Sequence, residues 1–101
     1  MTVYLIVRAV VPDAHRKAFD EWYQEEHLPD AYRAFKVLNA QRGWSEVDPA
    51  VHLAMYEFPD LAAADAVLKT QVIKDFVAEF DRHWAGKVER TRELFEVIQK
   101  I

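Results

Sequence analysis

The chain has 101 residues, no cysteine and a formal net charge of −4, from 13 Lys and Arg against 17 Asp and Glu. This length suits one domain, residues 1–101, and the lack of cysteine excludes disulfides, thiolate metal sites and cysteine nucleophiles. The negative charge disfavours nucleic acid and anionic membranes as partners, and no apolar run is long enough to cross a bilayer. The N-terminal stretch lacks the basic leader and cleavage site of a signal peptide, so we expect a cytoplasmic protein.

The first predicted element is a strand over Thr2 to Val11, which is rich in β-branched residues. Asp13 follows as the expected N-cap of a helix from Ala14 to about His27. Because the residue before a proline avoids the α region, Pro29 is expected to end or kink this helix.

Three further strands and a second helical stretch follow. The helical stretch starts at the pair Pro59-Asp60, is expected to break near Thr70, and ends at Gly86. These elements are predicted, in chain order, as a strand over Lys36–Val47, a strand over Val51–Phe58, a helical stretch over Leu61–Ala85 and a strand over Val88–Ile98.

The resulting order βαββαβ predicts a ferredoxin-like α+β fold: a four-stranded antiparallel sheet with two helices on one face. In that topology the first and third strands are central and the second and fourth are edges. The first and third predicted strands are the most apolar, whereas the other two carry many charges, which agrees with this placement.

The two central strands are apolar on both faces. In the first strand Leu5 alternates with Tyr4 and Ile6, although helices can cover only one face of the sheet. The expected cover for the other face is a second copy of the sheet, which gives a two-fold homodimer. The alternative is a monomer with one exposed apolar face. A charge at Ile6 or Tyr56 is expected to split the dimer if those side chains face the partner.

The stretch from Trp22 to Asp30, W-Y-Q-E-E-H-L-P-D, closely resembles a signature of EthD-like proteins, a family of the dimeric α+β barrel superfamily. Ala40-Gln41-Arg42 and Trp84 before the last strand are similar to further parts of the family pattern. The chain departs from the family at Phe35-Lys36, where Pro-Gly is common. The resemblance implies the same fold and a dimer. The superfamily includes isomerases, polyketide cyclases, cofactor-free monooxygenases and haem-degrading enzymes.

His27 and Tyr23 are the candidate catalytic residues. Together with Phe19 they are spaced four apart and share one helix face. The helix dipole favours a charged His27 and burial opposes it, so we expect titration near neutral pH, which suits a general acid or base. The alternative is that His27 caps carbonyls freed at Pro29. Tyr23 is expected to donate to a substrate oxygen, the alternative being an aromatic core residue.

The candidate ligand-binding residues are mainly aromatic. Arg42 is expected to bind a carboxylate or enolate, with a solvated edge arginine as the alternative. His52 is expected on the sheet face away from the helices, and the basic residues Arg90 and Arg92 are interpreted as a solvated edge. The histidine spacings predict no metal site, and the lack of glycine-rich motifs predicts no nucleotide cofactor. The complete ligand-binding set is Trp22, Arg42, Phe76, Phe80 and Trp84.

Three functions remain open on these grounds. The first is binding of a small apolar or aromatic molecule between the sheet and the helices, with acid/base chemistry of the isomerase, cyclase or decarboxylase type by His27. The second is cofactor-free monooxygenation. The third is a non-catalytic ligand-binding or accessory dimer.

Overall fold

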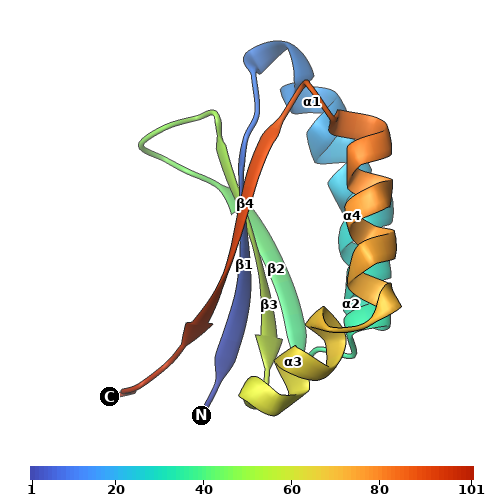
Figure 1. Cartoon of the computed structure of the whole chain (residues 1–101). Coiled ribbons are helices and arrows are strands. Elements are labelled where there is room, and N and C mark those ends of the chain that lie inside the picture. Colours follow the sequence, from blue (N-terminus) through green and yellow to red (C-terminus); the bar gives the residue numbers. More distant parts are fainter.

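The structure is a computed structural model that describes all residues, Met1–Ile101. Its strands form one antiparallel sheet in the order β2-β3-β1-β4 (Figure 1). The ferredoxin-like α+β class and the central position of the first and third strands are therefore confirmed. The strand bounds are β1 Val3–Val10, β2 Asn39–Trp44, β3 Val51–Phe58 and β4 Glu89–Glu96.

All helices lie on one face of the sheet, and the opposite face carries no helix (Figure 1). Each predicted helical stretch is divided in the structure. The second stretch breaks between Leu68 and Gln71, as predicted near Thr70, and Gly86 follows it with a φ of 77°. The helical bounds are α1 Asp13–Trp22, a π-helical turn η1 Tyr23–His27, α2 Leu28–Phe35, α3 Leu61–Leu68 and α4 Gln71–Trp84. No helix is long and apolar enough to span a membrane.

The two Pro-Asp pairs begin their helices differently. The Asp60 carboxylate accepts a hydrogen bond from the backbone N–H of Ala63 at 2.8 Å and caps α3 as this residue type predicts. Asp13 is not a cap: it is the first residue of α1, the N-cap is Pro12, and no side chain satisfies the first turn. Its carboxylate still lies favourably in the first turn because of the helix dipole.

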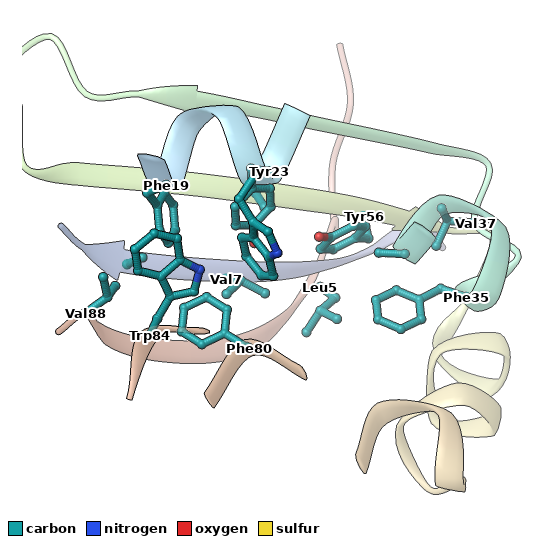
Figure 2. Close-up of a cluster of buried hydrophobic side chains, with 14 of the residues drawn as sticks. Leu5, Val7, Phe19, Tyr23, Phe35, Val37, Tyr56, Phe80, Trp84 and Val88 are labelled. Atoms are coloured by element: carbon teal, nitrogen blue, oxygen red, sulfur yellow. The ribbon is translucent and has the colours of Figure 1, made fainter. Parts of the chain in front are cut away.

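Alternation along the central strands separates the two faces of the sheet. Val3, Leu5, Val7 and Ala9 of β1 point toward the helices and are buried. Figure 2 shows Phe19 and Tyr23 approaching this layer from the first helical stretch and Phe80 and Trp84 approaching it from α4. The core is therefore aromatic between the helices and aliphatic on the sheet.

The opposite face is formed by half-buried and exposed side chains with no element over them. Tyr4, Ile6 and Val10 of β1 lie there beside Leu53 and Met55 of β3. Tyr56 does not belong to this face: its side chain is buried among the helices, so the expectation that it faces a partner is wrong. The reason is the period of two, which puts Tyr56 on the same side as Ala54 and Phe58.

Candidate functional site

Tyr23 and His27 are the first and last residues of the π-helical turn η1, and both are buried. Of the two outcomes expected at Pro29, an end or a kink, the helix does not end there: it is interrupted by the π-helical turn and continues to Phe35. A proline cannot donate to the carbonyl four residues earlier, and its ring clashes with that carbonyl in a regular α-helix. The wider turn just before Pro29 relieves this conflict. Lys36, with a φ of 54°, then ends α2 in the left-handed conformation where the resembling family often has glycine.

His27 is enclosed by aromatic rings. Its imidazole stacks on Trp22 at 4.4 Å between ring centroids and meets Tyr23 edge-on at 4.8 Å. The residue is 8% exposed and makes no capping hydrogen bond. Burial, followed by the positive charge of Arg90, lowers the pKa of His27 to about 4. The imidazole is therefore neutral at neutral pH. The expectation of titration near neutral pH is wrong, because burial outweighs the position at the end of a helical segment.

Two tyrosine hydroxyls meet beside His27. Tyr23 and Tyr56 are each 1% exposed, and the Tyr56 hydroxyl points toward Tyr23 (Figure 2). Burial raises the pKa of Tyr23 to about 12, although a hydrogen bond donated by Tyr56 and the charge of Arg90 oppose the shift. Burial also raises the pKa of Tyr56. Both phenols therefore keep their protons at neutral pH and act as hydrogen-bond donors.

A small cavity of about 30 Å³ lies where these groups converge. By the same measure a single water needs about 10–15 Å³, whereas ligand pockets run to about 300–1,000 Å³. In this conformation the cavity is therefore too small for an aromatic ligand. Its lining includes Tyr23, His27, Tyr56 and Arg90, with apolar side chains from α4 opposite the sheet. The remaining lining residues are Leu5, Val7, Phe35, Ile73, Phe76, Val77, Phe80 and Arg92.

Four of the predicted site residues line this cavity, namely His27, Tyr23, Phe76 and Phe80. Phe80 is buried, whereas Phe76 is half-buried. Trp22 and Trp84 lie behind them in the core, 5.9 Å apart between ring centroids, and do not line the cavity. Both indole N–H groups are buried without a partner. The Trp22 and Trp84 rings pack the two helical stretches against each other and so support the site.

Arg42 belongs to a separate polar cluster on the other side of Tyr23. Its guanidinium donates to the Asp20 carboxylate at 2.8 Å, and the same oxygen accepts from the Trp44 indole at 2.8 Å. These two bonds and the charge of Arg42 lower the pKa of Asp20. Arg42 is therefore held by Asp20 and lies outside the cavity beside His27.

His52 also belongs to this cluster, on the helix side of the sheet and not on the outer face that the sequence reading assigned to it. It is completely buried, and its Nε2 accepts from Arg42 at 3.3 Å. The proton must then reside on Nδ1, which is buried and unpartnered. Burial, followed by the charge of Arg42, lowers the pKa of His52 to about 4. Strand alternation would have identified its face, since His52 and Tyr56 are four residues apart and lie on the same side of β3, opposite to Leu53.

Arg90 is the functional candidate that sequence reasoning missed. It pairs with Ala9 of β1 and so projects to the helix side, where its guanidinium lies 3.9 Å from the Phe80 ring centre. The signal was present in the sequence: arginines at alternate positions 90 and 92 share one face of a strand. Grouping them with the flanking Glu89 and Glu93 as one solvated edge hid that alternation. No three His, Cys, Asp or Glu side chains converge into a metal-binding group.

No family model matches the chain, and no curated protein matches it. Solved structures do match. An EthD family protein from Bacillus halodurans aligns with a TM-score of 0.77 and 20% identity over 97% of this chain and 100% of that chain. A mutant of SnoaB from Streptomyces nogalater, described as a cofactor-independent oxygenase, aligns with a TM-score of 0.69 and 12% identity over 99% and 96%. A dimeric ferredoxin-like protein from an uncultured marine organism aligns with a TM-score of 0.72 and 14% identity over 99% of this chain and 97% of that chain.

This chain has the ferredoxin-like fold of these proteins. An EthD family protein is among these structures, in agreement with the fold that the first-helix motif implied. At these identities the likeness is one of fold, and residue roles depend on the site of this chain alone.

Proposed function

We propose that the chain binds a small aromatic or apolar carbonyl compound beneath α4 and removes a proton from it without a cofactor. The observation that carries the proposal is the convergence of a neutral imidazole, two phenol donors and a guanidinium on one cavity with apolar walls. A base and an oxyanion-stabilising group in one water-poor space are what such proton transfer requires. His27 is the proposed base.

The proposed reaction starts at a carbon next to a carbonyl group. A ring nitrogen of His27 takes the proton, and the electron pair of the broken C–H bond moves into the carbonyl, whose oxygen becomes an enolate. Tyr23 or Tyr56 donates a hydrogen bond to that oxygen, and Arg90 supplies positive charge. The new negative charge beside the imidazole raises the pKa of His27, which helps it to hold the proton. Return of the proton to another carbon completes an isomerisation.

Ligand binding requires α4 to move outward from the sheet, because the resting cavity is too small. Phe80 and Trp84 anchor the second half of α4, whereas Ile73 and Phe76 in its first half are only half-buried. The first half is also bounded by the break at Thr70. These features support opening at the start of α4, next to the cavity.

The test uses β-tetralone, whose benzylic carbon lies next to a ketone. The purified full chain in D₂O is expected to catalyse deuterium incorporation at that carbon, followed by NMR, and His27→Gln is expected to lose at least about 100-fold of this rate. His15→Gln, at a histidine outside the cavity, is the matched control. Equal rates for His27→Gln and the wild type, or no exchange above buffer, would overturn the proposal.

A second candidate, cofactor-free oxygenation, is favoured by the structural likeness to a protein described as a cofactor-independent oxygenase. It shares the first step, since the carbanion formed at His27 would then react with O₂ in place of a proton. Oxygen consumption that accompanies β-tetralone turnover and depends on His27 would select oxygenation. Exchange without oxygen consumption would select isomerase-type chemistry.

We also propose that the chain forms a homodimer through the outer face of the sheet. The support is the uncovered set of apolar side chains on the central strands and the structural likeness to a protein described as a dimeric ferredoxin-like protein. Burial of that face against its own copy leaves the helices and the cavity on the outside of the dimer.

A further inference from the structure

Arg92 is a cation without a partner on the helix side of β4. It pairs with Val7 and so projects to the same side as Arg90, one alternation away. Arg92 is exposed and makes no ion pair, and Arg90 has only a long contact of 3.5 Å to the Asp81 carboxylate. The one carboxylate contact of the two neighbouring guanidiniums thus belongs to Arg90.

The position of Arg92 joins two hollows. One is the inner cavity of about 30 Å³ beside His27, and the other is an open hollow of about 250 Å³ on the α3 side of it. Leu5 and Arg92 line both, so the open hollow is the natural vestibule of the cavity. The vestibule lining is completed by Leu68, Glu93 and Leu94.

The electrostatics at this junction favour an anion. Burial lowers the pKa of Arg90, the Asp81 carboxylate opposes the shift, and the positive charge of Arg92 lowers the pKa further. The two guanidiniums therefore repel each other in a partly desolvated place. Glu89 and Glu93 flank the two arginines in sequence, but they pair with Val10 and Ile6 and so alternate to the outer face of the sheet, although Glu93 also borders the vestibule. A carboxylate between the two arginines would remove the repulsion and use a free planar fork of donors.

The walls beyond the arginines determine the rest of the ligand. Leu5, Leu68 and Leu94 form an apolar vestibule, and Phe76 and Phe80 stand over the inner cavity. A flat apolar group can enter between them once α4 opens, whereas a second anionic group would find no further cation, because Arg90 and Arg92 are the charged residues that line the inner cavity. This selects a ligand with one anionic end and one aromatic end.

We propose that the ligand is a small aromatic carboxylate whose ring lies under α4 and whose carboxylate is held by Arg92 with Arg90. The inference rests on the proposed function, since it assigns the substrate class of the same site. Arg92 is its specificity-determining residue, because it is the exposed arginine that reaches the vestibule and has no other partner.

The test compares cinnamate with cinnamamide, which has nearly the same shape but no charge. Isothermal titration of the full chain is expected to show about tenfold tighter binding of cinnamate, the size typical of one charge-assisted contact at a partly exposed site. Arg92→Gln is expected to reduce the preference to about onefold, and about 0.5 M KCl to weaken cinnamate binding but not cinnamamide binding. Lys74→Gln removes an equal charge from the exposed side of α4 and is expected to change nothing.

Equal affinity for the two ligands, or a preference that survives in Arg92→Gln, would overturn the inference. The outcome is separable from that of the proposed function, because binding here does not require turnover. A cinnamate preference that depends on Arg92, together with β-tetralone exchange that is insensitive to His27, would retain the carboxylate site and reject the proton chemistry. Exchange that depends on His27, without any preference for cinnamate over cinnamamide, would retain the proton chemistry and reject the carboxylate site.

Discussion

Tyr23 lies between two buried imidazoles. Its ring centroid is 4.8 Å from that of His27 and 4.6 Å from that of His52. Burial is the first cause of the low pKa of both histidines, and each lies near about 4. At neutral pH the three rings therefore form an uncharged cluster, because both imidazoles are neutral and the phenol of Tyr23 keeps its proton.

The histidine pair makes stability depend on pH. A histidine has a pKa near 6.5 in the unfolded chain, so as pH falls the unfolded state takes up protons before the folded state does. Stability from each histidine is fully present above about 6.5 and is lost between about 6.5 and about 4, by roughly 3 kcal/mol per group. Urea unfolding at a series of pH values measures this loss.

His27→Gln is expected to remove about half of that pH dependence, because one of the two proton-uptake sites is gone. His15→Gln serves as the comparison, since His15 is not one of the buried pair. Because the pKa of Asp20 is lowered, protonation of Asp20 reduces stability only at pH values below the range in which the histidines titrate. An unchanged slope in His27→Gln between about pH 6.5 and 4 would contradict the burial of this imidazole as a neutral group.

At the scale of elements, α4 is held chiefly by two large rings. Phe80 and Trp84 are 2% and 6% exposed, and Phe80 lies between Trp22 and Arg90. The rest of the helix presents half-buried or exposed side chains. An element attached mainly at one end is the one expected to open first.

Phe80→Ala is expected to lower the free energy of unfolding by about 3–5 kcal/mol, the cost of a large ring removed from a closely packed core. Chemical denaturation measures the change. Lys74→Ala on the exposed side of the same helix is expected to stay within about 0.5 kcal/mol. A loss below about 1 kcal/mol for Phe80→Ala would mean that α4 does not pack on the core through this residue.

The elements that were predictable carry local signals. The third strand was placed at its exact bounds because Asp48-Pro49 and Pro59-Asp60 flank an apolar run, and the end of α4 follows from Gly86. Pro29 predicted an end or a kink of the first helix, but not which of the two, and the continuation to Phe35 depends on the π-helical turn before it. Strand ends were also overestimated: β2 begins three residues later than expected, because Lys36 takes the left-handed conformation.

The candidate site was predictable where it lies on one helix face. A spacing of four residues placed Tyr23 and His27 on one helix face. The same spacing placed Phe76 and Phe80 together on α4, which forms the opposite wall of the cavity. Tyr56 and Arg90 come from strands far apart in the sequence, and only the antiparallel register brings them beside His27. Burial of His27, and hence its low pKa, depends on this long-range packing and not on the helix end.

At the scale of the whole molecule, the sheet has one covered face and one uncovered face (Figure 1). Along β1 the uncovered face alternates apolar and polar groups, with Ile6 near the middle and Arg8 one alternation further on. Glu93 lies opposite Ile6 on β4, and Leu53 is 38% exposed on β3. A two-fold copy would bury the apolar centre and set the charged groups at the rim, which is the usual anatomy of a stable interface.

Light scattering at micromolar concentration is expected to give about 24 kDa, two copies of 11.8 kDa. Ile6→Lys is expected to shift the mass to that of one copy, because an unpaired charge buried at the centre of the interface is costly. Val47→Lys adds the same charge on the exposed β2–β3 loop, where Val47 is 95% exposed, and is expected to leave the dimer intact. Tyr56 is unsuitable for this test, since its ring packs under the helices and a charge there would unfold the chain. A single-copy mass for the wild type, or an unchanged mass for Ile6→Lys, would reject the outer sheet face as the dimer interface.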